Sequence, residues 1–349
     1  MKAIVLAGGE GTRLRPLTYT TPKPLLPIAN RPFLEHQLAW LAGHGVDEVV
    51  LSLGYRPDAF AGHFSSGSFQ GVRLRYAVEP EPRGTAGAIR FAADQTCEDG
   101  QGFTGRYLVC NGDVLTDLDV TALVRFHEDR GAEATIALTR VEDPSAFGVV
   151  PTDENGRVIR FVEKPPPGQA PTDWINAGTY VLEASVIRDI PAGRAVSIER
   201  ETFPGLLAAD GKLFAMPSPG YWLDIGTPVK YLQANADVLA GRLSAAGSPN
   251  SSGQAGPGGP GSSVADDAEV TGSVIGPGAQ VGERARIIRS VLLEGARVAP
   301  AAEVVDSVIG PGAVVGSGAV VSELSIVGAG AEVAAGSRLA GARVEAAGR

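Results

Sequence analysis

The chain has 349 residues, which is long enough for two or three domains with a large core. Its net charge of −9 lacks the broad basic field of a nucleic-acid-binding protein, and no stretch approaches the roughly 18 apolar residues of a membrane span, so neither nucleic acid nor a membrane is an expected partner. All five Lys and all 21 aromatic residues lie at or before Tyr231, so the remaining 118 residues must build a core from small and β-branched aliphatic side chains.

Alternating strand and helix patterns occupy the chain before residue 240. Strands are predicted at 2–7, 48–53, 72–78, 107–110, 134–139, 158–162 and 175–182. Helices are predicted at 33–42 and 228–239. This alternation is typical of an α/β sheet that helices cover on both faces.

A glycine-rich turn, Gly8-Gly9-Glu10-Gly11-Thr12-Arg13-Leu14, follows the first predicted strand. It is not a dinucleotide fingerprint, because Leu14 replaces the third glycine, and it lacks the GK[ST] ending of a P-loop. Backbone N–H groups of such a turn can approach an anion closely, and Arg13 adds a guanidinium for phosphate oxygens. The turn alone leaves phosphate binding and a plain tight turn open. Lys23, whose backbone two prolines fix, favours phosphate binding.

A segment rich in small residues interrupts the chain at 245–263. Of its 19 residues 14 are Gly, Pro or Ser and none is charged, so it buries too little apolar surface to offset the entropy of ordering. We therefore expect one domain at 1–244, a flexible linker at 245–263 and a second domain at 264–349.

The last segment repeats every 17 or 18 residues. The run SVIGPGA begins at Ser273 and again at Ser307, and related runs begin at Ser290 and Ser325. Aliphatic residues recur about every six positions within each repeat. Three six-residue faces per turn are typical of a triangular parallel β-helix, and hexapeptide repeats of this kind resemble the left-handed form. Its narrow interior accounts for the absence of aromatic residues.

The run LAGGEGTRLRPLTYTTPKPLLPI at 6–28 resembles the signature of the sugar-1-phosphate nucleotidylyltransferases, which join a nucleoside triphosphate to a sugar-1-phosphate and release pyrophosphate. Further matches follow in the family's order: EPEPRGTAG at 79–87, NGD at 111–113, FGV at 147–149, FVEKP at 161–165, NAG at 176–178 and WLDIGTP at 222–228. The motifs PKPLLPI and RGTAG are most similar to the mannose-1-phosphate guanylyltransferase branch. The resemblance implies a Rossmann-like nucleotidyltransferase domain with a mixed, mostly parallel sheet, followed by the left-handed β-helix.

The resemblance also implies roles for individual residues. Arg13 and Lys23 would bind the triphosphate and the charge that develops in catalysis, and Asp113 and Asp224 would hold Mg²⁺, because a hard cation prefers carboxylate oxygens and bridges phosphates. These four residues are the expected catalytic set. The nucleotide would contact Leu6, Ala7, Gly8, Gly9, Gly11, Thr12, Arg13, Glu79, Gly84 and Thr85, and the sugar phosphate Gly148, Glu163, Lys164 and Asn176. Simpler roles stay open for Asp113 as a turn residue and for Asp224 as a loop acid.

Glu79 predicts the preferred base. A carboxylate only accepts hydrogen bonds, which suits the adjacent N1–H and N2–H donors of guanine and opposes the carbonyl oxygens of thymine or uracil. We therefore expect GTP as the nucleotide, with mannose-1-phosphate as the sugar phosphate. The alternative that Glu79 is an ordinary surface acid stays open.

Other functions remain possible at this point. Glucose-1-phosphate thymidylyltransferases and uridylyltransferases belong to the same family, and a regulatory relative would bind a nucleotide sugar without catalysis. Hexapeptide helices also occur in acyltransferases that use a catalytic histidine, but no histidine follows His127. The β-helix is therefore expected to serve assembly into a homo-oligomer. With two Cys residues and no recognisable secretory signal, a cytoplasmic location is expected.

Overall fold

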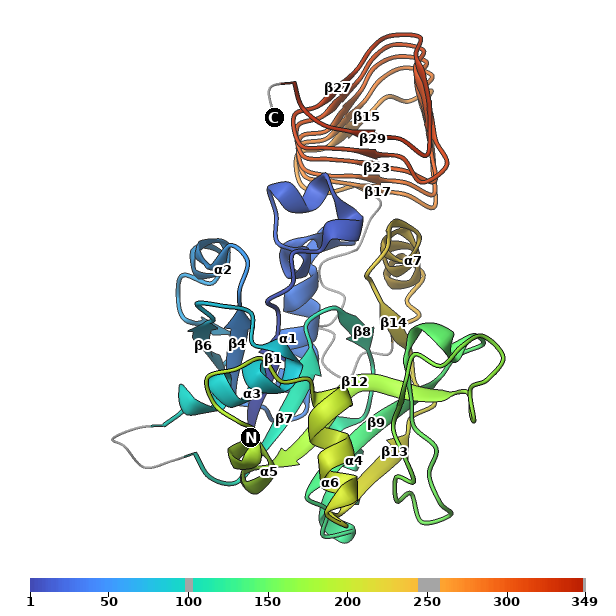
Figure 1. Ribbon diagram of the computed structural model, residues 1–349. Coiled ribbons are helices and arrows are strands. Elements are labelled where there is room, and N and C mark those ends of the chain that lie inside the picture. The colour runs from blue at the N-terminus through green and yellow to red at the C-terminus, as the bar shows by residue number, and fades with distance from the viewer. Residues whose placement is uncertain (98–102, 244–257, 348–349) are drawn as a thin grey trace. The chain divides into compact units, whose positions relative to one another are not determined.

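The computed structural model describes residues 1–97, 103–243 and 258–347, which form two compact units (Figure 1). Unit 1 comprises Met1–Gly9 and Gln37–Trp222. Unit 2 comprises Glu10–His36 and the described residues of Leu223–Ser244 and Ser248–Arg349. Within the described residues, no helix has both the length and the apolar character that a membrane span needs.

Unit 1 is built on a ten-stranded mixed sheet. Four parallel strands lie in the order β6-β4-β1-β7, and their bounds are β1 Lys2–Leu6, β4 Glu48–Leu53, β6 Val72–Val78 and β7 Arg106–Asn111. The remaining strands are β5 Ser68–Phe69, β9 Ala134–Arg140, β10 Gly148–Val149, β11 Val162–Glu163, β12 Trp174–Glu183 and β13 Leu213–Pro217. Strand β12 runs antiparallel to β7 and to β9, so the predicted mixed, mostly parallel sheet is confirmed.

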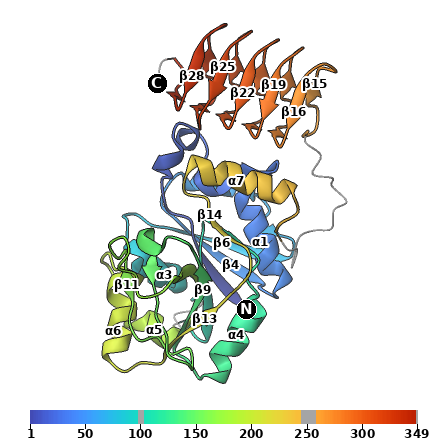
Figure 2. The same ribbon diagram turned by 90° about the vertical axis from the view of Figure 1, so that its right-hand side faces the viewer.

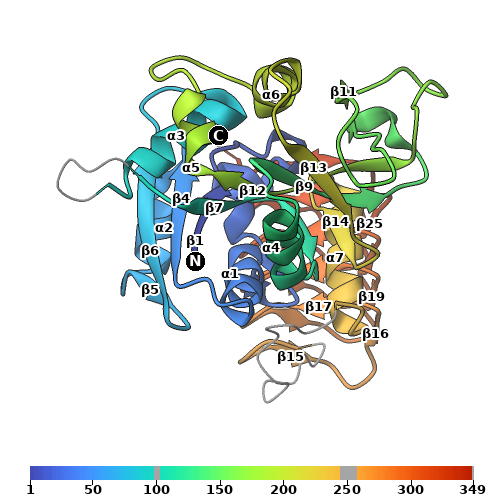
Figure 3. The same ribbon diagram turned by 90° about the horizontal axis from the view of Figure 1, so that it is seen from below.

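Helices cover both faces of this sheet (Figure 3). Helices α3 and α5 lie on one face and α4 on the other. The helices of unit 1 are α2 Pro57–His63, α3 Gly84–Asp94, α4 Val120–Asp129, α5 Ala184–Asp189 and α6 Phe203–Ala208, with short helical turns at Pro144–Ala146 and Ile198–Thr202. Helix α1, Phe33–Gly43, begins in unit 2 and ends in unit 1. Apolar side chains from the sheet and from α3 and α5 form one buried core.

One predicted strand is wrong. Residues 158–162 do not form a continuous strand: Val158 makes only an isolated bridge to Thr152, and pairing resumes in β11 at Val162. The apolar run VIRFV misled the prediction, because Ile159 is 62% exposed and packs against no core. An isolated exposed aliphatic residue is common on protein surfaces.

The C-terminal part of unit 2 is a parallel β-helix of triangular section (Figure 1), whose coils stack one behind the other (Figure 2). It has three sheets of five short parallel strands, in the orders β15-β18-β21-β24-β27, β16-β19-β22-β25-β28 and β17-β20-β23-β26-β29. The strands are β15 Ser263–Val264, β16 Glu269–Thr271, β17 Val274–Ile275, β18 Gln280–Val281, β19 Arg286–Ile288, β20 Val291–Leu292, β21 Arg297–Val298, β22 Glu303–Val305, β23 Val308–Ile309, β24 Val314–Val315, β25 Val320–Ser322, β26 Ile326–Val327, β27 Glu332–Val333, β28 Arg338–Ala340 and β29 Arg343–Val344.

The repeat length sets the register of the coils. Ile287 pairs with Val304 and Val304 with Val321, at intervals of 17 residues. The next interval along these strands, from Val321 to Leu339, has one residue more, and the corner before β26 accommodates it with two consecutive left-handed residues, Glu323 and Leu324, at φ of 56° and 61°. The extra residue therefore changes a corner and leaves the strands aligned.

The serine that begins each repeat is buried in the structure, and its hydrogen bonds explain why this position is polar. Ser290 donates its hydroxyl hydrogen bond to the carbonyl oxygen of Ile288, and its oxygen accepts from the N–H of Ser307 one coil further along. Ser290 in turn donates its N–H to the hydroxyl of Ser273. A buried hydroxyl is costly unless it is hydrogen-bonded, and this ladder satisfies each hydroxyl across coils.

The ordered coil begins before residue 264. Gly258 forms a parallel bridge with Ile275, and the N–H of Gly259 donates to the Ile275 carbonyl oxygen at 2.7 Å. Residues 258–263 of the predicted linker thus pair through their backbone, which needs no apolar side chain, and 245–257 lie outside the described residues.

The rest of unit 2 consists of short turns, a hairpin, one helix and the end of the short strand β14 Trp222–Asp224. Helical turns at Thr12–Leu14, Leu17–Tyr19 and Lys23–Leu25 precede β2 Pro27–Ile28 and β3 Arg31–Pro32, and α7 spans Pro228–Leu239. Helix α7 begins where Thr227 caps the N–H of Lys230, with Pro228 in the first turn. The hairpin turn contacts both neighbours, because Ala29 donates to Asn235 of α7 and Asn30 donates to Ile275 of the β-helix.

The prediction that the interior of the β-helix is too narrow for an aromatic side chain can be tested at two adjacent residues of β24. Val315 is fully buried inside the coil, whereas Val314 points outward and is half-buried. We expect Val315→Phe to lower the free energy of unfolding by about 1–3 kcal/mol through overpacking. Val314→Phe should stay within about 0.5 kcal/mol of the parent. Urea unfolding of the full chain, followed by circular dichroism, measures both, and equal losses would contradict the assignment of inside and outside.

Candidate active site

The predicted nucleotide motif lies where the strand order of unit 1 reverses. Chain order runs from β1 through β4 to β6 on one side, and β7 then follows on the other side of β1. Ligands of open α/β sheets bind outside the carboxyl ends of the strands at such a reversal. Leu6 ends β1 and Asn111 ends β7, and the N–H of Gly112 donates to the Leu6 carbonyl oxygen at 2.8 Å.

Glycines allow the backbone segments at this edge to meet. A Cβ atom on Gly112 would lie 2.5 Å from the Leu6 carbonyl oxygen, and one on Gly54 would lie 3.1 Å from the Gly8 carbonyl oxygen. The first separation is too short for a side chain, and the second would crowd one. The predicted residues that end β1 are therefore held by direct backbone packing against the segments after β4 and β7.

The Glu79 carboxylate lies beside this turn, directly after β6. Its Oε1 accepts a hydrogen bond from Ser52 Oγ at 2.9 Å, and its Oε2 accepts from the N–H of Arg83 at 3.0 Å. A Cβ atom on Gly8 would lie 3.7 Å from Oε1. The carboxylate is half-buried and its orientation is fixed by one donor on each oxygen.

The loop that opens α3 is closed against a second backbone segment. The N–H groups of Ala86 and Gly87 both donate to the carbonyl oxygen of Val196. Gly84 has φ of +66°, and a Cβ there would lie 2.6 Å from that same oxygen, so only glycine fits. The Thr85 hydroxyl donates to Glu199 and accepts from a backbone N–H. Thr85 therefore uses its side chain to fix this loop.

The predicted sugar residues Gly148, Glu163 and Lys164 lie close together. Gly148 of β10 pairs with Glu163 of β11, and a Cβ on Gly148 would lie 2.5 Å from the ring of Phe161. Lys164 has φ of +50°, a strained conformation for a residue with a side chain, and its Nζ lies 3.7 Å from Glu163 Oε1. Strain of this kind is concentrated at functional sites. The Lys164 side chain is 60% exposed, so its ammonium is accessible to a ligand.

Asn176 lies at an irregular point of β12. Its Nδ2 donates to the Tyr180 hydroxyl at 2.7 Å, and its Oδ1 accepts from the N–H of Gly178 at 2.8 Å. Burial raises the pKa of Tyr180, so its phenol stays neutral. The amide of Asn176 is thereby oriented and keeps one further N–H for a ligand. Gly178 has φ of +72°, and a Cβ there would clash with Asn111.

Unit 2 brings together three of the four residues predicted for catalysis. Lys23 is only 7% exposed, and its Nζ lies 3.9 Å from Asp224 Oδ1. Arg13 packs over Gly226, where a Cβ would lie 2.5 Å from Nη2 of the guanidinium. Asp224 Oδ1 also accepts from the N–H of Gly226 at 2.8 Å. A buried lysine, a guanidinium and a carboxylate thus surround one tight turn.

Lys230 is a functional candidate that the sequence analysis did not include. Its Nζ lies 3.8 Å from Asp224 Oδ2, so two lysines flank the same carboxylate. Lys230 lies in the first turn of α7, six residues after Asp224. The only signal in the sequence is the scarcity of lysine, since the chain holds five in total.

The predicted residues divide between the two units. Unit 1 holds Leu6, Ala7, Gly8, Gly9, Glu79, Gly84, Thr85, Asp113, Gly148, Glu163, Lys164 and Asn176, and unit 2 holds Gly11, Thr12, Arg13, Lys23 and Asp224. Among the described residues, no group of three or more His, Cys, Asp and Glu side chains could hold a metal ion by itself. Burial raises the pKa of Cys110 on β7 to about 12, so this thiol stays protonated and is a poor nucleophile.

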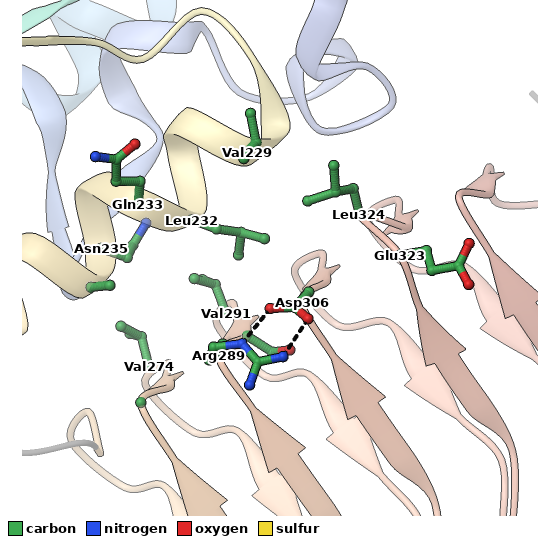
Figure 4. Close-up of a pocket in the computed structure, with 13 residues that line it drawn as sticks. Val229, Leu232, Gln233, Asn235, Val274, Arg289, Val291, Asp306, Glu323 and Leu324 are labelled. Carbon is green, nitrogen blue, oxygen red and sulfur yellow. Dashed lines mark hydrogen bonds and ion pairs between the residues drawn. The ribbon is translucent and has the colours of Figure 1, made fainter.

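A groove of about 440 Å³ lies elsewhere in unit 2, between α7 and one face of the β-helix (Figure 4). Val229 and Leu232 of α7 line it on one side and Leu324 on the other. Arg289 and Asp306 form a bidentate ion pair in its wall, at 2.7 and 2.6 Å. None of the residues predicted for the site lines this groove.

Comparisons with known proteins agree with the motifs. Residues 259–347 match the model of the GMPPB C-terminal domain. The mannose-1-phosphate guanylyltransferase of Mycobacterium tuberculosis is 46% identical over 240 residues, covering 68% of this chain and 65% of that protein. Mannose-1-phosphate guanylyltransferase 1 of Arabidopsis thaliana is 44% identical, covering 66% and 63%. The chain thus spans somewhat less than two thirds of the length of these relatives.

A solved structure of another protein has a fold similar to that of this chain. HddC from Yersinia pseudotuberculosis, also crystallised in a complex with GMP-PN, superposes with a TM-score of 0.58 at 30% identity, covering 68% of this chain and 99% of that one. Residues 2–241, more than half of the chain, match the family model described as nucleotidyl transferase. The resemblance inferred from the motifs is confirmed, and the chain belongs to the nucleotidyl transferase family.

Proposed function

We propose that this protein is a mannose-1-phosphate guanylyltransferase, which converts GTP and mannose-1-phosphate into GDP-mannose and pyrophosphate. The names of the relatives at 44–46% identity support the substrates. The observation in the chain itself that carries the proposal is the fixed Glu79 carboxylate beside the turn at Gly8. A carboxylate there accepts from the N1–H and N2–H groups of guanine and repels the carbonyl oxygens of a pyrimidine.

In this reaction a phosphate oxygen of mannose-1-phosphate attacks the α-phosphorus of GTP. A new bond forms between that oxygen and the α-phosphorus, the bond from the α-phosphorus to the bridging oxygen breaks, and pyrophosphate leaves with the electron pair. Attacking and attacked groups are both anionic, so positioning and charge neutralisation dominate the barrier. We assign Arg13 and Lys23 to the triphosphate and its developing charge, and Lys230 adds a third cation beside Asp224.

The same proposal assigns the sugar side to the loops around β10 and β11. Lys164, whose ammonium is accessible, would bind the phosphate of the sugar. Glu163 and the oriented amide of Asn176 would bind sugar hydroxyls, together with the backbone at Gly148. Gly148 carries no Cβ because the ring of Phe161 occupies that position, so its part in binding would be made by backbone groups.

We assign Asp113 of unit 1 and Asp224 of unit 2 as the proposed ligands of Mg²⁺, each on the chemistry of its carboxylate. No larger group of metal-binding side chains occurs among the described residues, and Mg²⁺ typically binds one or two carboxylates and takes its other ligands from phosphates and water. When bound, the ion would neutralise charge on the phosphate oxygens. Asp224 already lies between two lysines, so the residues here carry both signs of charge. Assembly into a homo-oligomer through the β-helix stays a prediction.

The direct test is pyrophosphate release from a matrix of GTP, dTTP, UTP and ATP against mannose-1-phosphate and glucose-1-phosphate, each with Mg²⁺. We expect the highest kcat/KM for GTP with mannose-1-phosphate. A preference for dTTP or UTP with glucose-1-phosphate would support the thymidylyltransferase or uridylyltransferase alternative. No turnover with any pair would support a regulatory protein.

Glu79→Gln tests the base assignment. Because an amide both donates and accepts, the variant should have a lower kcat/KM with GTP and a higher kcat/KM with dTTP. The ratio of kcat/KM for GTP to that for dTTP should fall by about tenfold or more, as expected for one hydrogen bond to a charged group. Glu81→Gln, two residues further along the same loop, is the matched control and should leave the ratio unchanged. Equal ratios in parent and Glu79→Gln would refute the assignment.

Asp224→Asn tests the charged cluster of unit 2. Removing the carboxylate should lower kcat by at least about 100-fold, a typical loss when a group that stabilises transition-state charge is removed. The Mg²⁺ concentration for half-maximal rate should rise as well. Asp210→Asn removes an exposed carboxylate that pairs with Arg157, and this control should leave both quantities near the parent values. A parent-like Mg²⁺ dependence in Asp224→Asn would show that Asp224 is not a ligand.

A further inference from the structure

Ser52 is a buried polar residue near the carboxyl end of β4, and the three residues between it and the strand's first residue, Glu48, include no other polar side chain. All six residues of β4 are buried, and Ser52 is 1% exposed. An apolar residue of similar size would fill the same space, whereas a buried hydroxyl is costly unless it is hydrogen-bonded. The hydroxyl of Ser52 donates to Glu79 Oε1 at 2.9 Å. Its contribution is therefore this one bond.

That bond completes the support of the Glu79 carboxylate. The N–H of Glu79 donates to the carbonyl oxygen of Leu53 at 2.8 Å, which fixes the backbone, and the N–H of Arg83 donates to Oε2. With Ser52 on Oε1, each carboxylate oxygen has one internal donor. An ionised carboxylate offers about four acceptor sites, so each oxygen keeps capacity for a further donor.

Both internal donors are uncharged. Ser52 contributes a hydroxyl and Arg83 a backbone N–H, while the Arg83 guanidinium lies over the ring of Phe91, 4.8 Å from its centre. Among the residues that the structure describes, none neutralises this carboxylate in an ion pair, so it is oriented and keeps its charge. Its negative charge stays available to attract guanine donors and to repel pyrimidine carbonyl oxygens.

Ser52 also connects the carboxylate to the glycine-rich turn. Its backbone carbonyl oxygen accepts from the N–H of Ala7 at 2.9 Å, and Ala7 directly precedes Gly8, whose Cβ position lies 3.7 Å from Glu79 Oε1. One residue therefore holds both the end of β1 and the group assigned to the base.

We propose that Ser52 is a positioning residue for guanine discrimination, which holds the Glu79 carboxylate in the orientation that receives the two donors of the base. This inference rests on the proposed function of Glu79. Without the hydroxyl, the carboxylate rotates more freely and must be ordered when GTP binds. The cost falls on nucleotide binding and on the choice of base, while the phosphate chemistry is unaffected.

The test compares Ser52→Ala and Ser52→Thr with the parent, using GTP and dTTP. We expect Ser52→Ala to raise the KM for GTP about five- to tenfold with kcat nearly unchanged, as for the loss of a hydrogen bond to a charged group, and to leave the KM for dTTP unchanged. Ser52→Thr keeps the hydroxyl and should restore most of the selectivity. In a Glu79→Gln background, Ser52→Ala should have no further effect on the ratio of kcat/KM values.

Thr96→Val is the control for the loss of a buried hydroxyl. Thr96 is 5% exposed, and its hydroxyl contacts the Tyr107 hydroxyl at 2.7 Å. Tyr107 lies at the start of β7, so this pair is at the edge of the sheet opposite to the carboxyl ends of the strands, where Glu79 lies. This variant should lose thermal stability without a change in selectivity. If Ser52→Ala lowers GTP and dTTP turnover equally, its role is structural and the inference fails.

Two further outcomes separate the inference from the proposed function. If Glu79→Gln lowers the GTP to dTTP ratio and Ser52→Ala does not, the positioning role is overturned and the function of Glu79 stands. If Glu79→Gln also leaves the ratio unchanged, the base assignment and the role of Ser52 fall together.

Discussion

The predicted nucleotide site of unit 1 depends on close contacts between backbone segments at glycines, where a side chain would clash with or crowd its neighbour. Gly54 meets the carbonyl oxygen of Gly8, Gly112 meets that of Leu6, and Gly84 meets that of Val196. These contacts join the ends of β1, β4 and β7 and close the loop before α3, so the groups around them have little freedom to move. Such rigidity is what an enzyme that works by positioning requires, because charge must be matched to a fixed geometry.

Charge in unit 2 is organised differently, around a single carboxylate. Lys23 is almost fully buried and would be unstable there without a counterion, which the Asp224 carboxylate supplies. Lys230 pairs with the other oxygen of the same carboxylate. Arg13 packs against the neighbouring Gly226. The cluster concentrates positive charge in a chain of net charge −9, so it can attract an anion such as the proposed triphosphate locally although the chain as a whole is acidic.

The sequence predicts those features whose pattern has one physical cause. The strands at 48–53 and 72–78 have the predicted bounds because their apolar runs end at turn residues, and the β-helix follows from its repeat and from the missing aromatic residues. Features whose meaning comes from a partner in another element were not predictable. Ser52 sits in an apolar run and Lys230 in an ordinary helix, and their significance comes from Glu79 and Asp224, 27 residues and six residues away along the chain.

The extra residue in the last full repeat of the β-helix bears on how such a domain changes in evolution. Glu323 and Leu324 both take left-handed backbone conformations at the corner, and the strands on either side keep their partners. An insertion at a corner therefore costs local strain in one turn, whereas an insertion inside a strand would reverse which side chains face the interior. A protein lineage can therefore lengthen a coil or add a loop at a corner. It can lengthen or shorten the whole β-helix only by adding or removing complete coils.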